Sequence, residues 1–489
     1  MKIYKAFEQA KNGTTIPIFL SGKTMESRYN PERDADNLCA SIEGEFSFFL
    51  ILGIGSGIFI QKLSEKFPSA KIIGLELFDE DIDFLRQSQI IAQLEENQNV
   101  IFSSLKNFEK NICKNYLPAK HGELKIIEQR AWVLENQSYI ENINQTLQKA
   151  INIVSADYSV QAHFGKIWTF NILNNAKLVN QNQLNTEFDI TKTAVIVAAG
   201  PTLDKTISIL SERNKYFIIS TDTAASVLNK HSIIPDVIIS IDGQNVSFNH
   251  FHNCPSTLYA FDLCSNFSAA KHIVKKHNNV IFFISGHPLS LAINSCNNNQ
   301  LPFLFSGAGT VTITAVDFAV QAGFTKLFIL GADFSYSNGK AYAQGTYLDS
   351  LYNKASSKIS SSEYLFSKLL FRTELKQKAS TFTTDVLEAY KDSLENYLEL
   401  KNISFIKEND IYNLTCNEKF TDSLPDKISN TKNFSPATFF EKLESSTPEE
   451  AEILLLPYIA WLRNNKKYKN SSYSELLKLA FNTIVSYNI

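Results

Sequence analysis

Residues 193–203, TAVIVAAGPTL, decide the fold that this sequence predicts. The apolar run from Thr193 to Val197 is typical of a strand buried on both faces of a parallel sheet. Gly200 permits a tight turn, and Pro201 suits the first position of a following helix. The N–H groups at the start of that helix, including that of Thr202, would then form a site for an anion.

Similar short apolar segments follow at intervals that leave room for helices between them. This alternation predicts a parallel sheet covered by helices, and a last segment at 403–406 could close it. The segments are 216–220, 236–241, 258–263, 280–284 and 326–330.

The beginning of the chain predicts a second sheet. FSFFLIL at 46–52 reads as a buried strand, 58–67 has helical spacing, and KIIGLE at 71–76 reads as the next strand. The turn between them carries Gly53, Gly55 and Gly57, and Glu76 ends the second strand. These residues resemble the cofactor turn of S-adenosylmethionine-dependent methyltransferases, with Glu76 placed to accept from ribose hydroxyls. The glycines could equally serve packing alone, which would leave the turn vestigial.

The whole chain therefore predicts an α/β protein with two Rossmann-like domains and a helical C-terminal region. We expect a methyltransferase-like domain at 1–150, a helical connector with a hairpin at 151–190, a nucleotide-sugar domain at 191–415 and a helical domain at 416–489. With 47 Lys and Arg against 50 Asp and Glu, the chain has no basic excess for nucleic acid. Its apolar runs fall short of the roughly 20 residues that span a bilayer, and its scattered cysteines fit a cytoplasmic protein.

Polar residues follow several strands of the 191–415 region. Asp222 and Asp242 end two successive strands, and Asp333 ends a later one. Ligands bind beyond the carboxyl ends of such strands, so we expect these residues to share one crevice with the Gly200 turn. Asp222 could instead cap the next helix.

Two loops complete the predicted crevice. Ser306 and Gly307 precede a helix, and the turn Asn338-Gly339 separates Tyr336 from Tyr342 so that both phenols can face one side. Tyrosines can also anchor loops by packing.

These blocks carry a family resemblance. AAGPTL, STDTA, PDVIISIDGQ and SGAGT followed by GFTKLFILGADF resemble the central domain of the motility accessory factor (Maf) flagellin glycosyltransferases. That domain is similar to archaeal 6-hydroxymethylpterin diphosphokinases and, more distantly, to bacterial CMP-sialic-acid-dependent sialyltransferases, whose two tyrosines match Tyr336 and Tyr342.

The resemblance implies a reaction. A nonulosonic acid, of the pseudaminic or legionaminic type, would pass from its CMP-activated donor to Ser or Thr hydroxyls of flagellin. The N–H groups after Gly200, with Ser306, Tyr336 and Tyr342, would stabilise the leaving phosphate. No nucleophilic residue is required, the CMP-sugar donor is a substrate, and the resemblance establishes no cofactor.

The chain departs from the sialyltransferases at two places. Amides stand there where this chain has Ala199, Asp222 and Asp242, and two carboxylates near a phosphate repel it unless a divalent metal lies between them. Thr384-Asp385 match, but Ser380 stands where the general base histidine is expected. His287 is the best-placed substitute, with His250 and His252 behind it.

Three alternatives remain open from the sequence. The protein could be an ATP-dependent pterin diphosphokinase, a methyltransferase that uses the Gly53 turn, or a non-catalytic flagellin-binding assembly factor.

Overall fold

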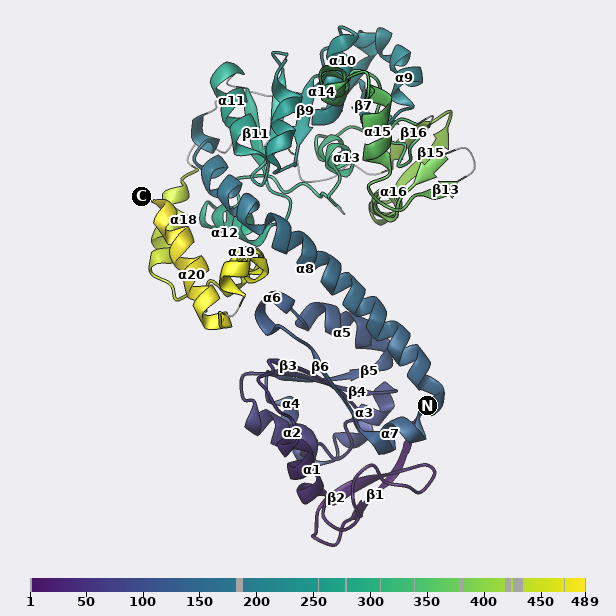
Figure 1. Ribbon diagram of the computed structural model, residues 1–489, viewed down its shortest axis with the longest axis vertical. Coiled ribbons are helices and arrows are strands. Elements are labelled where there is room, and N and C mark those ends of the chain that lie inside the picture. The colour runs from purple at the N-terminus through teal and green to yellow at the C-terminus, as the bar shows by residue number, and fades with distance from the viewer. Residues whose placement is uncertain are drawn as a thin grey trace. The chain divides into compact units, whose positions relative to one another are not determined.

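The computed structural model describes residues 2–181, 188–253, 255–277, 279–307, 309–337, 339–378, 381–417, 424, 434–469 and 471–488. The chain forms two compact units. The first comprises residues 1–165 and 456–480, and the second comprises residues 166–455 and 481–489. Both contain parallel sheets with helices packed on them, as Figure 1 shows for each unit, so the predicted α/β fold class is confirmed.

The first unit is built on a four-stranded parallel sheet of order β5-β4-β3-β6. Its strands are β3 (Phe48–Leu52), β4 (Lys71–Glu76), β5 (Val100–Ser104) and β6 (Lys125–Glu128). All five residues of β3 are buried, which explains the absence of polar residues in that run. Helix α2 (Ile58–Lys66) follows the glycine turn, and an antiparallel hairpin of β1 (Tyr4–Gln9) and β2 (Thr15–Phe19) precedes the sheet.

The second unit contains an eight-stranded sheet of order β11-β10-β9-β8-β7-β12-β16-β15. The six strands from β11 to β12 in this order are parallel, and β16 and β15 run antiparallel at one edge. The strands are β7 (Thr193–Val197), β8 (Tyr216–Thr221), β9 (Val237–Ser240), β10 (Leu258–Asp262), β11 (Val280–Phe283), β12 (Lys326–Leu330), β15 (Ile403–Glu408) and β16 (Ile411–Cys416).

Strand β7 explains why this sheet needs a cover on both faces. Ala194 and Ile196 belong to the core on one side, together with helix α13 (Val311–Gln321). Val195 and Val197 belong to the core on the other side, together with helix α10 (Asp222–Lys230). Strand order reverses at β7, because β8 lies on one side of it and β12 on the other. This reversal is where open parallel sheets bind ligands.

Two features of the sheet differ from the sequence prediction. The segment at 403–406 lies in β15, but it does not join the parallel strands directly, because β16 lies between it and β12. We did not predict β16, whose residues border the region expected to be helical.

The predicted helical hairpin of the connector is instead one 37-residue helix, α8 (Ile140–Ala176). Its only glycine, Gly165, does not break it. The segment 416–489 also does not form a compact unit of its own, since residues 456–480 group with the first unit. Its described helices are α18 (Pro436–Glu444), α19 (Glu452–Asn464) and α20 (Tyr473–Val485).

Gly165 explains how α19 packs in the first unit. A Cβ atom at Gly165 would lie 1.8 Å from the Pro457 carbonyl oxygen, so the two backbones touch.

No described helix is long and apolar enough to cross a membrane.

We predict that Gly165→Ala destabilises the protein. In an unconstrained helix this change adds up to about 1 kcal/mol of stability. Here the added methyl collides with backbone, and the overlap should cost about 1–3 kcal/mol. Urea denaturation followed by tryptophan fluorescence measures the sign directly, and a more stable variant would show that the close contact does not exist.

Candidate active site

The turn after β7 lies against the turn after β12. The Gly200 N–H donates to the Gly331 carbonyl at 2.8 Å, and a Cβ atom at Gly200 would lie 2.4 Å from that oxygen. At Gly331, φ is +67° and a Cβ atom would lie 2.3 Å from the Ala198 carbonyl oxygen. Each glycine is therefore required by the backbone of the other turn, and together they hold the two strand ends at the point where strand order reverses.

Asp333 closes this turn from the β12 side. Its Oδ2 accepts the Thr202 N–H at 2.7 Å, and its Oδ1 accepts the Thr202 hydroxyl. Burial raises the pKa of Asp333, while the Thr202 hydrogen bonds and the charge of Lys407 oppose the shift. The predicted anion site is changed accordingly, because one of its N–H donors is taken by Asp333.

Pro201 does not begin the helix as predicted. The short helix α9 (Leu203–Thr206) begins two residues later, with Thr202 in the cap position. Because Pro201 and Thr202 form part of the turn itself, they bring the chain close to Asp333 rather than presenting a long helix to a ligand.

Asp222 and Asp242 end the neighbouring strands β8 and β9, and the structure brings them together as predicted. Asp222 is 2% exposed, and it accepts the Ser240 hydroxyl at 2.6 Å and the Thr223 N–H at 2.6 Å. Thr221, not Asp222, caps helix α10, so the capping alternative is wrong. Asp242 is half-buried and accepts the Gln244 N–H at 2.8 Å. Burial raises the pKa of Asp242, and the negative charge of Asp222 raises it further.

Asp222 and Asp242 are the predicted ligands of a divalent metal. Among the described residues, no three His, Cys, Asp or Glu side chains are grouped so that they could hold a metal ion. Both oxygens of Asp222 already accept hydrogen bonds from the protein.

Of the two predicted tyrosines, Tyr342 lies near Asp222, and Tyr336 lies near Tyr342. Burial raises the pKa of Tyr342 to about 12, and the nearby Tyr336, Tyr347 and Asp222 add to the shift. Tyr342 is nevertheless 39% exposed. Burial also raises the pKa of Tyr336. Asn338 lies outside the described residues, but Gly339 has a φ of +71° and the Lys340 N–H donates to the Ser337 carbonyl at 2.9 Å, so the chain turns there.

Two further tyrosines face the same carboxylates, and sequence reasoning missed both. Tyr347 begins helix α14 (Tyr347–Ala355), and its pKa is raised by burial and by the charges of Asp242 and Asp222. Tyr390 lies on helix α16 (Asp385–Leu400), and its pKa is raised by burial and by Asp242. No sequence motif marks them, since both are brought in by tertiary packing.

The histidines divide into different roles. His287 precedes helix α12 (Pro288–Cys296) and caps it, because its Nδ1 accepts the Leu289 N–H at 3.1 Å. Burial lowers the pKa of His287 to about 3. A base that is already hydrogen-bonded and this weak does not suit proton transfer near pH 7, so we correct its predicted role to a structural one.

His250 lies closer to the carboxylates. Its ring packs edge-on against Tyr347, with centroids 4.7 Å apart, and its charge lowers the pKa of Asp242. The Nδ1 atom of His250 is buried and has no hydrogen-bond partner. The ring Nε2 of His252 instead lies 3.1 Å from the side-chain oxygen of Asn249.

The Ser306 loop approaches helix α16. The Ser306 carbonyl accepts the Gly309 N–H at 2.9 Å. Gly307 has a φ of +54°, and a Cβ atom there would lie only 2.5 Å from the Ser393 hydroxyl oxygen. Ser393 lies about one helical turn beyond Tyr390 on α16. The Ser306 loop therefore contacts this helix close to Tyr390. Ala308 lies outside the described residues.

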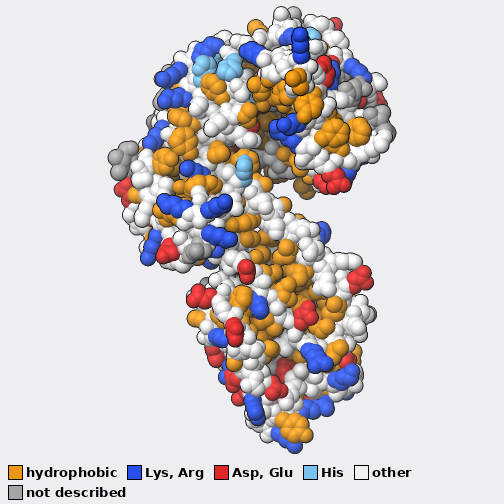
Figure 2. Space-filling model, viewed as in Figure 1, with side chains coloured by type: hydrophobic (Ala, Val, Ile, Leu, Met, Phe, Trp, Pro, Cys, Tyr) orange, Lys and Arg blue, Asp and Glu red, His pale blue; other side chains and the backbone are white. Residues whose placement is uncertain are grey.

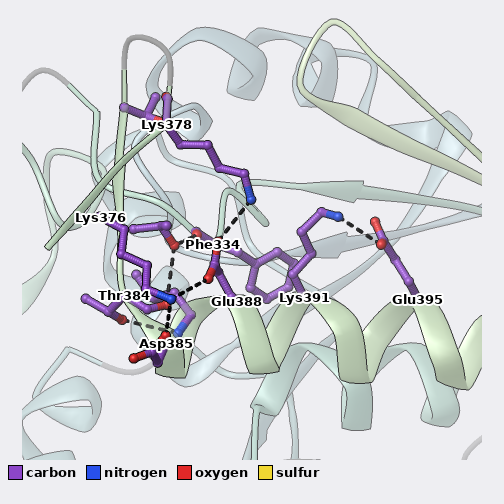
Figure 3. A network of polar contacts seen from close by, with 11 residues as sticks. Phe334, Lys376, Lys378, Thr384, Asp385, Glu388, Lys391 and Glu395 are labelled. Carbon is purple, nitrogen blue, oxygen red and sulfur yellow. Dashed lines mark hydrogen bonds and ion pairs between the residues drawn. The ribbon is translucent and has the colours of Figure 1, made fainter.

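Figure 3 shows polar contacts at the start of α16, which join this helix to Lys376 and Lys378. Thr384 caps the helix, while Lys376 pairs with Asp385, and Lys378 pairs with Glu388 at 3.1 Å. These lysines belong to β13 (Lys376–Lys378), which pairs with β14 (Thr381–Thr383). Strand β14 also forms hydrogen bonds with the loop that carries Tyr336. The Phe382 N–H donates to the Tyr336 carbonyl at 2.9 Å. The Thr383 hydroxyl donates to the Phe334 carbonyl at 3.1 Å. Ser380, where a histidine was expected, lies outside the described residues.

Lys407 is a cation at this edge that sequence reasoning missed. It lies on β15, opposite Tyr412 in the register, with its Nζ 4.6 Å from the centroid of the Tyr412 ring. Burial lowers the pKa of Lys407, while Asp333 raises it. The β15–β16 hairpin therefore brings a positive charge towards the Gly200 turn.

The predicted cofactor turn of the first unit is different. Glu76 is 0% exposed, and its Oε1 accepts the Tyr4 hydroxyl at 2.9 Å and the Ile54 N–H at 2.8 Å. Its Oε2 accepts the Trp132 Nε1–H at 2.8 Å. Both oxygens are thus taken by protein donors, and Glu76 does not reach a ribose as predicted.

Comparison with known protein families gives a match within the second unit. A family model described as 6-hydroxymethylpterin diphosphokinase MptE-like matches residues 169–339. Two uncharacterized proteins of Treponema pallidum (strain Nichols) are similar, one 36% identical over 29% of this chain and 51% of its own length, the other 34% identical over 30% of this chain and 72% of its own length. The match therefore spans about half of the first relative.

Residues 169–339 therefore match an MptE-like domain, in agreement with the resemblance to motility accessory factors. The fold is that of a Maf glycosyltransferase. A solved Maf structure from Magnetospirillum magneticum AMB-1 matches with a TM-score of 0.52 over 98% of this chain and 90% of that one, at 12% identity.

We predict a pH dependence from Glu76. Burial raises its pKa to about 7, so the folded protein binds a proton that the unfolded chain releases near pH 4.5. This contribution to stability is present below pH 4.5 and is lost as the pH rises through 7, with a loss of up to about 3 kcal/mol.

Glu76→Gln isolates this effect from other titrating groups. The amide cannot accept from both Tyr4 and Trp132, so the variant should be less stable, with a deficit that shrinks between pH 5 and pH 8. Urea denaturation across this range measures the difference, and a deficit independent of pH would contradict the assignment.

Proposed function

We propose that the protein transfers a nonulosonic acid, of the pseudaminic or legionaminic type, from its CMP-activated donor to Ser or Thr hydroxyls of flagellin in the cytoplasm. The observation that carries this proposal is the grouping of the Gly200 turn, Asp222, Asp242 and the tyrosines at one edge of the eight-stranded sheet. The MptE-like domain and the Maf glycosyltransferase fold support a nucleotide-dependent transferase.

The tyrosines supply neutral donors for the leaving group. As the bond between the anomeric carbon and the phosphate oxygen breaks, negative charge grows on CMP. Tyr342, with its pKa near 12, stays protonated and can donate a hydrogen bond to that oxygen. Lys407 offsets the charge of Asp333 next to the turn, which reduces the repulsion expected of carboxylates near a phosphate.

Asp242 is the carboxylate better suited to the nucleotide. Asp222 is buried and committed to Ser240 and Thr223, whereas Asp242 is half-buried. It can accept hydrogen bonds from ribose hydroxyls or from the cytosine amine. Asp222 accepts the Ser240 hydroxyl at the end of β9, and this hydrogen bond helps to position Asp242, two residues further on.

His250 is the base in this proposal. The acceptor hydroxyl forms the new bond to the anomeric carbon, and its proton passes to His250, which packs against Tyr347 and interacts with the charge of Asp242. A carboxylate beside an imidazole stabilises the imidazolium that forms.

A protein acceptor fits the surface around the loops that follow Tyr342. Large apolar side chains are exposed there, including Leu351 (48%), Tyr364 (58%) and Phe371 (72%). Figure 2 shows hydrophobic side chains on the surface of the second unit. Exposed apolar side chains of this kind can contact a protein partner.

The second candidate function is ATP-dependent pyrophosphate transfer to 6-hydroxymethylpterin, which the description of the family model favours. That chemistry uses Mg²⁺, which proteins commonly hold through one or two carboxylates together with the substrate phosphates. Calorimetric titration of the purified protein with CMP and with ATP plus Mg²⁺ separates the two. Tighter binding of ATP would overturn the glycosyltransferase proposal.

We predict that Tyr336→Phe/Tyr342→Phe loses most of the transfer. Incubation with flagellin and a CMP-nonulosonate, followed by intact-mass analysis, should show at least a 100-fold slower gain of mass. The variant should still fold and bind CMP, because Asp242 and the Gly200 turn continue to hold the nucleotide. Tyr29→Phe, at an exposed tyrosine of the first unit, is the matched control. Unchanged transfer by the double variant would remove both phenols from the mechanism.

His250→Asn should reduce the rate constant for transfer by about 10²-fold or more without weakening donor binding. His252→Asn serves as the control, and a transfer rate constant in His250→Asn equal to that of the wild type would exclude His250 as the base.

A further inference from the structure

The glycine turn of the first unit is shaped like a cofactor turn but is filled by the chain itself. A Cβ atom at Gly55 would lie 1.9 Å from Cε of Met25 and 2.3 Å from Oε1 of Glu26. These two side chains come from the segment between β2 and α1 (Pro31–Ala40), about 30 residues before the turn. In a binding turn, glycine leaves this space for the ligand to approach the backbone.

Glu26 takes the place of an anionic ligand. Its Oε1 accepts the Ser56 N–H at 2.5 Å, just before helix α2, where backbone donors favour negative charge. Its Oε2 is buried and has no hydrogen-bond partner. The Thr24 hydroxyl donates to the Glu26 carbonyl at 2.8 Å and fixes the backbone that delivers the side chain.

The rest of the turn is also closed. A Cβ atom at Gly53 would lie 2.7 Å from the Trp132 ring, whose Nε1–H donates to Glu76. Tyr4, from the β1–β2 hairpin, donates to the other oxygen of Glu76. The positions that a nucleoside would occupy, against the turn and at the end of β4, are therefore filled by Met25, Glu26, Tyr4 and Trp132.

We infer that Glu26 is a built-in carboxylate ligand of the Gly53–Gly57 turn, so that this turn fastens the segment after β2 to the sheet and does not bind S-adenosylmethionine. The residues present do not fit the cofactor that the turn suggests. When the Glu26 side chain is removed, the vacated site should accept a small carboxylate from solution.

Chemical rescue tests this in the full-length protein. Glu26→Ala leaves the Ser56 N–H without its acceptor and should lower the melting temperature by a few degrees. Acetate at tens of millimolar, compared with chloride at equal ionic strength, should restore at least half of that loss. Acetate should not change the wild type or Glu43→Ala, in which an exposed glutamate is removed from the same unit.

Three results would overturn the inference. They are an acetate effect of equal size in all three proteins, a Glu26→Ala melting temperature equal to that of the wild type, and calorimetric binding of S-adenosylmethionine to the wild type. If Glu26→Ala does not fold, Glu26→Gln replaces it. Its amide oxygen can still accept from Ser56, so this variant should fold and should not respond to acetate, and a response would contradict the assignment.

Discussion

The contact between the turns after β7 and β12 is the constraint on which the second unit depends. Gly200 and Gly331 each approach the backbone of the other turn more closely than any side chain would allow. The Asp333 carboxylate then accepts the Thr202 N–H and links the two turns. Because this contact lies where the strand order reverses, it fixes the crevice edge from which Asp222, Asp242 and the tyrosines are arranged.

The sequence predicted this part well because its signals are local. Continuous apolar runs marked the parallel strands, and the polar residues at their ends fell on one edge for geometric reasons. Tyr347, Tyr390 and Lys407 were missed because α14, α16 and the β15–β16 hairpin bring them in from distant parts of the chain. His287 was misassigned because nothing in Ser-Gly-His-Pro tells a capping histidine from a catalytic one.

The two units show that one local pattern has two outcomes. Both place glycines after a buried strand and an acidic residue beyond a neighbouring strand. In the first unit, Glu76 is fully buried and satisfied by Tyr4, Ile54 and Trp132, so the pattern serves packing. In the second, Asp242 remains half-buried beside tyrosines with desolvated hydroxyls. The side chains that arrive from elsewhere decide between a structural turn and a binding site, and the turn itself does not reveal them.

The central claim is that the nucleotide binds at the edge organised by Gly200 and Gly331. A crystal structure of the protein with CMP tests this most directly. The account predicts that the phosphate lies beyond the ends of β7 and β12, within hydrogen-bonding distance of a Tyr342 or Tyr336 hydroxyl, with the ribose or base on Asp242. Density for CMP at the Gly53–Gly57 turn, with the crevice edge empty, would contradict it.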